Sequence, residues 1–134
     1  MSSKKKNKVK KNIRDLEKER QQVLAELLNF KEMLRGSAAT VYTKCGRENC
    51  RCKDGKGHPH TRITWTEKAK GYTRKIPKKE MPWIKKVTNN YRNFRSLRQR
   101  LKKLEADIKE LQDELEDILV SDTRETKNYL WTKQ

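Results

Sequence analysis

The chain has 134 residues, of which 32% are apolar and 40% are charged, and its formal net charge is +17 at pH 7. This length excludes two full-sized domains, and so low an apolar fraction excludes a large globular core. No stretch approaches the roughly 20 apolar residues of a membrane span, and no apolar segment follows the basic N-terminus as it would in a signal peptide. The charge predicts attraction to a polyanion, either DNA or RNA, with an anionic membrane surface as a lesser alternative.

The first elements in chain order are a basic arm and a helix. Residues 1–12 contain six Lys and no acid, which predicts a disordered arm. Residues 13–35 are predicted to be the first helix, which Gly36 would end. Its apolar residues advance in steps of three and four, apart from Arg20, which interrupts the series: Ile13, Leu16, Val23, Leu27, Phe30 and Leu34.

Residues 81–121 are predicted to be a second, longer helix that begins near Pro82. From Leu97 onward two apolar positions recur in every heptad with charged residues between them, which is typical of a coiled coil. The apolar series 13–34 and 97–118 each cover 22 residues. Their equal length favours an antiparallel hairpin, with Leu34 facing Leu97 and Ile13 facing Ile118. A parallel homodimer would use the same pattern.

Residues 36–80 differ from the helices in composition. The stretches ATVYTK and HTRITWTE alternate β-branched and aromatic residues, and GYTRKIP follows a turn-like EKAKG. We therefore predict an α+β, mostly helical fold: two long helices form an antiparallel coiled-coil hairpin with a small zinc-stapled β-hairpin head at its tip. The tail, residues 122–134, contains the sequence NYLW, which either packs on the helices or docks on a partner.

All three cysteines and both histidines fall within residues 44–60. Cys45, Cys50, Cys52 and His58 form the pattern C-x4-C-x-C-x5-H, which supplies the four ligands of a tetrahedral zinc site. A complete set of protein ligands predicts structural rather than catalytic zinc, with the binding energy contributing to the folding of the head. His60 is the alternative fourth ligand, and His58 is preferred because Pro59 stiffens the chain before His60.

The segment CGRENCRCKDGKGH, followed by TRITW, GYTRKIP and a helix containing NNYRNFRSL, resembles an uncharacterised bacterial family of short basic proteins. The resemblance covers roughly residues 36–100, and the family's segment is CG-x3-C-x-C-x2-G-x2-H. This chain has HPH where the family usually has His-Gly-Pro-aromatic. Genes of that family are often found beside transposases and other mobile-element genes, so the resemblance implies a mobile-element setting and no established activity.

The charge is unevenly distributed along the chain. Residues 37–80 have twelve basic and four acidic residues, residues 81–103 have eight basic and no acidic residues, and residues 104–122 have eight acids and one Lys. We expect the head and the following helix to bind nucleic acid. The predicted contacts are Lys44, Arg47, Arg51, Lys53, Arg74, Lys75, Lys85, Lys86, Arg92, Arg95, Arg98 and Lys102.

These observations predict a nonenzymatic DNA-binding accessory protein of a mobile element, which assists a transposase or site-specific recombinase. We expect it to be cytoplasmic and nucleoid-associated, in a bacterium or encoded by a phage, with no membrane partner. No phosphate-cradling Gly motif or Ser/His/Asp arrangement indicates an enzyme, so no catalytic residue is predicted. Two alternatives remain: a protein-interaction adaptor or inhibitor whose basic head docks an acidic protein, and an RNA-binding module.

Overall fold

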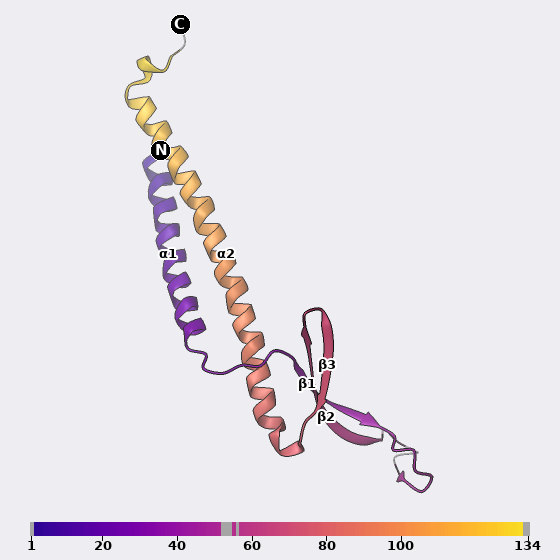
Figure 1. Cartoon of the computed structure of the whole chain (residues 1–134). Coiled ribbons are helices and arrows are strands. Elements are labelled where there is room, and N and C mark those ends of the chain that lie inside the picture. The colour runs from indigo at the N-terminus through magenta and orange to yellow at the C-terminus, as the bar shows by residue number, and fades with distance from the viewer. Residues whose placement is uncertain (1, 52–54, 56, 133–134) are drawn as a thin grey trace. The chain divides into compact units, whose positions relative to one another are not determined.

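The computed structural model describes residues 2–51, 55 and 57–132, and it is α+β, with two helices and a small antiparallel sheet, as the sequence predicts. The elements along the chain are α1 (Ser2–Leu28), β1 (Ser37–Thr43), β2 (His58–Glu67), β3 (Lys70–Lys75), a short 3₁₀ helix η2 (Lys78–Glu80), α2 (Met81–Thr126) and a second 3₁₀ helix η3 (Asn128–Leu130). Figure 1 labels the α-helices and the strands.

The chain divides into two units, and α2 contributes to both of them. The helical unit comprises Met1–Asn29 together with Ser96–Gln134. The sheet unit comprises Phe30–Arg95, and therefore holds the three strands and the first turns of α2.

Helix α1 begins at Ser2, which corrects the disordered arm predicted for residues 1–12. Lysine is a good helix former, so six lysines do not by themselves prevent a helix. Val9 extends the apolar series by one step ahead of Ile13, and its side chain is only 4% exposed. Lys5 also lies 4.0 Å from Glu114. The burial of Val9 and the proximity of Glu114 to Lys5 both favour a helix over a solvated arm in this segment.

The end of α1 also differs from the predicted one. The helix stops at Leu28, so Phe30 and Leu34 lie outside it. Both instead contact the first turns of α2: the ring of Phe30 packs edge-on against Phe94 at 5.7 Å, and the Leu34 N–H donates to the Val87 carbonyl at 3.1 Å. These tertiary contacts replace the helical hydrogen bonds that the apolar spacing alone would predict.

Within the helical unit, α1 and α2 are joined by ion pairs between Lys5 and Glu114 and between Glu19 and Arg100. The residue later in α1 pairs with the residue earlier in α2, as expected for two antiparallel helices (Figure 1). The register is shifted by about three helical turns from the predicted pairing of Ile13 with Ile118. The buried apolar residues of this unit are Val9, Val23, Leu104 and Ile108.

Arg20, which interrupts the predicted apolar series, is accommodated by a local ion pair. Its guanidinium donates two hydrogen bonds to the Glu17 carboxylate, at 2.7 Å from Nε and 2.6 Å from Nη2. The hydrogen bond from Arg20 lowers the pKa of Glu17, and the same hydrogen bond raises the pKa of Arg20. The charge is thus neutralised one turn away on the same helix.

The sheet has three strands in the order β1-β2-β3, and both neighbouring pairs are antiparallel. Strands β2 and β3 join through Lys68 and Ala69, whose φ values of 48° and 64° both lie in the left-handed region. A two-residue turn with positive φ at both positions is the geometry that suits a tight hairpin. The predicted β-hairpin is therefore present, with β1 added along the other edge of β2.

One face of the sheet packs on the start of α2. Ile63, Ile76 and Met81 are buried together, and Ala38, Trp65 and Ile84 pack against them. Val87 and Thr88 are almost fully buried in the next turn, where the Thr88 hydroxyl donates to the Ile84 carbonyl at 2.8 Å. This small core fixes the sheet to the helix and leaves the β1–β2 loop to be ordered by its own residues.

Candidate metal centre

The β1–β2 loop is closed by the pairing of Thr43 with His58, the last residue of β1 and the first of β2. Gly57, just before His58, has φ +99°, and a Cβ there would lie 2.5 Å from the backbone carbon and oxygen of Thr43. Only glycine combines this conformation with this close approach. The loop therefore returns to the sheet at a position that glycine alone can fill, and His58 follows immediately.

The structure brings Cys45, Cys50 and His58 together at the base of this loop. Their ligand atoms all lie within 4.8 Å of one another, and the Cys50 sulfur is 3.0 Å from His58 Nε2. Cys50 is positioned by a turn in which its N–H donates to the Arg47 carbonyl at 3.3 Å. The three side chains are close enough to hold a metal ion.

The donor set fits a thiophilic metal. Bonds of about 2.3 Å to sulfur and 2.0 Å to nitrogen place tetrahedral ligand atoms roughly 3.5 Å apart, which is compatible with the observed spacing. Thiolate and imidazole donors suit zinc, whereas calcium and magnesium prefer oxygen. Cys52, the remaining predicted ligand, lies outside the described residues. Of the two histidines, His58 joins the cluster, and His60, which lies two residues further along β2, does not.

The predicted nucleic-acid contacts in the head lie in two places. Lys44, Arg47 and Arg51 are exposed in the β1–β2 loop, on either side of Cys45 and Cys50. Arg74 and Lys75 are exposed at the end of β3. Lys53 lies outside the described residues.

The remaining predicted contacts are exposed on α2: Lys85, Lys86, Arg92, Arg95, Arg98 and Lys102. Arg95 lies over the ring of Tyr91, 5.8 Å from its centroid. Lys85, Arg92 and Arg95 share one side of the helix, because they are separated by seven and three residues. In the described part of the chain, none of these three forms an ion pair with an acidic residue. Their charge is thus free to attract an anion.

Lysine and arginine further along α2 are partly neutralised. Arg100 pairs with Glu19, and Lys103 donates to Asp107 at 2.9 Å. The hydrogen bond from Lys103 to Asp107 raises the pKa of this lysine. The available positive charge of α2 therefore lies mainly before residue 100, in the part nearest the sheet along the sequence.

Arg35 and Trp83, which are not among the predicted site residues, lie beside the sheet core. Together with Trp65 and other residues of the sheet unit they line a pocket of about 580 Å³. Trp83 falls outside the heptad series of α2, and it is 46% exposed. A large aromatic residue outside the apolar series of an amphipathic helix is the sequence feature that could have indicated Trp83.

The NYLW tail forms the short helix η3, and Tyr129, Leu130 and Trp131 are all exposed. The Arg124 guanidinium lies 5.3 Å from the centroid of the Trp131 ring, so this ring contacts the last turn of α2. Among the described residues, no helix combines the length and apolar content needed to cross a membrane.

Residues 13–86 match the model of a protein family described as a domain of unknown function, DUF6788. The match covers more than half of the chain and includes Cys45, Cys50 and His58. No curated protein and no solved structure matches the chain.

Proposed function

Since the chain belongs to the DUF6788 family, a domain of unknown function, we propose that it is a nonenzymatic nucleic-acid-binding protein with DNA as its ligand. The observation that carries this proposal is the exposed basic side of α2, with Lys85, Arg92 and Arg95 free of acidic partners in the described chain. An excess of 17 positive charges exceeds what solubility requires. Phosphate groups are the anions that such a surface would concentrate.

In this proposal one structural zinc ion orders the β1–β2 loop. Cys45, Cys50 and His58 supply three ligands, and Cys52 supplies the fourth. Bridging the two ends of the loop reduces its conformational freedom, so Lys44, Arg47 and Arg51 are presented on a fixed frame. Support comes from the donor geometry and from Gly57, which sets the return of the loop.

The helical unit would act as a protein-binding stalk. We propose that α1 and α2 pack as an antiparallel coiled coil, which the two ion pairs between them support. The acidic residues between 104 and 122 would then be presented to a basic protein partner. One unit would thus bind nucleic acid and the other a protein. Together with the resemblance to a family encoded beside mobile-element genes, this favours a protein that assists a transposase or site-specific recombinase.

Binding as a function of salt tests the proposal. The protein is purified in the presence of zinc and without metal chelators. It is then titrated into a labelled 20-base-pair duplex at several salt concentrations. Contact with about five to eight phosphates gives a log–log slope of roughly −4 to −7. Absence of binding, or an affinity independent of salt, would contradict the proposal.

Competition identifies the nucleic acid. Unlabelled duplex DNA should displace the probe more effectively than a structured RNA of equal length. If RNA competes better at equal nucleotide concentration, the ligand class is RNA. If a single acidic protein co-purifies and resists nuclease while no nucleic acid binds, the adaptor alternative replaces this function.

A further inference from the structure

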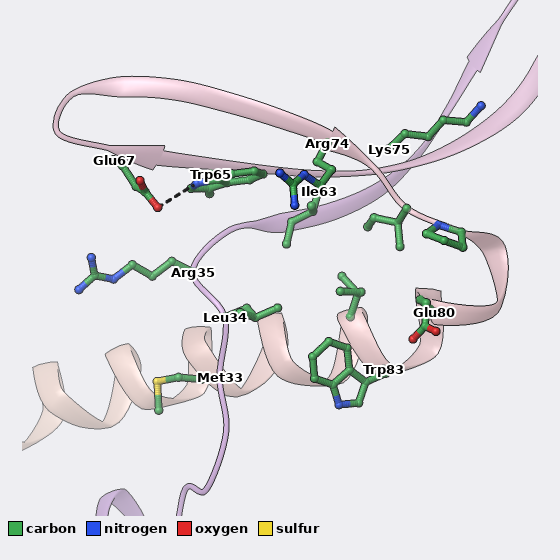
Figure 2. A pocket seen from close by; sticks show the side chains of 13 residues that line it. Met33, Leu34, Arg35, Ile63, Trp65, Glu67, Arg74, Lys75, Glu80 and Trp83 are labelled. Carbon is green, nitrogen blue, oxygen red and sulfur yellow. Dashed lines mark hydrogen bonds between the residues drawn. The ribbon is translucent and has the colours of Figure 1, made fainter.

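The pocket of about 580 Å³ lies within the sheet unit, between the inner face of β2 and β3 and the first turns of α2. We call it the Trp65 groove. Figure 2 shows Trp65 along its sheet side, Ile63 near its centre and Leu34 on the opposite side. The volume falls within the usual range for a small-molecule site, and the floor is apolar. The groove is therefore large enough for a single planar ring system.

Trp65 is held in a fixed orientation. Its ring stacks on Tyr72 of the neighbouring strand, with centroids 5.6 Å apart and planes 16° apart, and its indole N–H donates to Glu67 at 3.2 Å. On the side of β1, the residue next to Trp65 is Gly36, which contributes no side chain. A Cβ at Gly36 would lie 3.2 Å from the Trp65 Cβ and 2.6 Å from the Thr64 carbonyl oxygen. One side of the indole is thus supported by Tyr72, and no side chain from position 36 covers the other.

The rim of the groove carries charge of both signs. Arg35, Arg74 and Lys75 supply positive charge, while Glu67 and Glu80 supply carboxylates. In Figure 2 the Arg74 guanidinium lies beside Trp65 and Ile63, whereas Lys75 points away from the groove. Among the described residues, none of these five forms an ion pair. Glu67 already accepts the indole hydrogen bond on one oxygen. A purely apolar ligand would cover the floor but would offer no anion to Arg74 and no donor to the other oxygen of Glu67.

A nucleotide matches the aromatic ring of Trp65, the carboxylate of Glu67 and the positive charges of the rim. Its base offers a flat face to Trp65 and amino or imino hydrogens to Glu67, and its phosphate offers an anion to Arg74 or Arg35. We propose that the Trp65 groove binds one unpaired nucleobase of a DNA strand whose duplex part is held by α2. This inference rests on the proposed function and adds a preference for duplex ends, flaps or other sites with unpaired bases, to which a stacking ring adds affinity in a sequence-tolerant way.

The test compares three DNAs with the full-length protein: a blunt 20-base-pair duplex, the same duplex with a five-nucleotide 3′ thymidine overhang, and that overhang with abasic residues in place of thymidines. Abasic residues keep the phosphates and remove the stacking rings. Stacking of one base predicts roughly 5- to 150-fold tighter binding of the thymidine overhang than of the abasic one. Tryptophan fluorescence should be quenched by the thymidine overhang only.

Substitution locates the effect. Trp65→Ala should remove the preference for thymidine over abasic overhangs while leaving affinity for the blunt duplex unchanged. Trp131→Ala is the matched control, because Trp131 is exposed on the tail and does not line the groove. It should retain the full preference. Arg74→Ala provides a second variant, which leaves the stacked pair of Trp65 and Tyr72 in place. It should weaken binding of both overhangs by the same factor, so that the preference for thymidine over abasic residues is retained.

The outcomes separate the two proposals. Blunt-duplex binding with equal affinity for both overhangs overturns the groove inference and leaves the DNA-binding function standing, and this comparison needs no variant. Failure to bind any of the three DNAs overturns both. A preference that survives Trp65→Ala but is lost in Trp131→Ala assigns base stacking to the tail and also overturns the inference.

Discussion

At the scale of single residues, the candidate metal centre depends on a few positions with separate tasks. Cys45, Cys50 and His58 provide donor atoms, while Gly57 permits the backbone path that brings His58 back to them. The three donors could be predicted from residue type and spacing. The preference for His58 over His60 could be argued from the sequence only indirectly, whereas the structure places His58 at the start of β2 beside both cysteines and His60 two residues further along the strand.

His58→Ala should lose bound metal, whereas His60→Ala should retain it. In the proposed site of four zinc ligands, removal of one ligand would open the coordination shell and lower the affinity for zinc by several orders of magnitude, because the remaining thiolates would no longer enclose the ion. Elemental analysis after extensive dialysis measures the metal-to-protein ratio, expected to be one for His60→Ala and near zero for His58→Ala. The reverse result would assign the fourth position to His60.

Gly57→Ala should also lose metal, although it removes no ligand. Its Cβ would lie 2.5 Å from the backbone of Thr43 and 2.8 Å from the nitrogen of Lys44, and backbone atoms cannot move aside as a flexible side chain can. Gly55→Ala is the matched control, since no atom of the described residues lies within 4 Å of a Cβ there. We expect metal content to fall in Gly57→Ala and to be unchanged in Gly55→Ala. Equal retention would contradict the role given to this glycine.

At the scale of elements, the two helices show where apolar periodicity suffices and where it does not. It indicated both helices, but not the start of α1 at Ser2 or its end at Leu28. Lysines support helix when Val9 is buried and Glu114 is nearby, and Phe30 leaves the helix to contact Phe94. Both boundaries depend on residues of α2, which are remote in the sequence.

Arg20→Leu should stabilise the helical unit. Arg20 stands at a position of α1 where the apolar series requires an apolar residue. Its ion pair with Glu17 is partly exposed, and such contacts contribute little to stability. Leucine would complete the apolar series, and we expect the midpoint of thermal unfolding to rise by about 4 °C. Arg14→Leu, at an exposed position outside the apolar series of α1, should leave the midpoint of thermal unfolding unchanged. A lower midpoint for Arg20→Leu would mean that the ion pair outweighs the apolar contact.

Arg92→Glu combined with Arg95→Glu should weaken DNA binding without changing the fold. These exposed residues are three apart on α2, so both face the same stretch of phosphates. Loss of two phosphate contacts lowers the magnitude of the log–log salt slope by about 2. Anisotropy titrations measure the slope, and circular dichroism checks the helix content.

The matched control combines Lys109→Glu with Lys127→Glu. It changes the net charge by the same amount, at exposed positions within or after the acidic stretch. Its salt slope should remain that of the original chain. If the control loses as much affinity as Arg92→Glu with Arg95→Glu, total charge rather than a surface on α2 governs binding.

At the scale of the whole molecule, the division into a helical unit and a sheet unit implies that metal loss has local effects. The candidate metal ligands lie in the sheet unit, which has its own small core of Ile63, Ile76 and Met81. The buried residues of the helical unit, such as Val23 and Leu104, belong to the other unit. Each unit therefore has its own source of stability.

Removal of zinc by a strong chelator should accelerate amide hydrogen exchange in β1 and the start of β2 by at least tenfold. Exchange between residues 97 and 118 should be unchanged, because the hydrogen bonds of α2 there do not depend on the loop. Mass spectrometry of peptic fragments resolves these segments. Uniform acceleration along the chain would indicate a single cooperative unit, and no acceleration anywhere would indicate that the loop is ordered without metal.

Periodicity, composition and short-range spacing predict the α+β class, two helices, a β-hairpin and the Cys/His cluster, and the resemblance of the motifs indicates an uncharacterised family. Tertiary packing sets the limits of α1, its register against α2, the third strand beside β2 and the groove at Trp65. Each of these results from contacts between residues far apart in the chain, such as Leu34 with Val87 and Glu19 with Arg100. Local residue preferences carry no information about which distant partner a segment will meet.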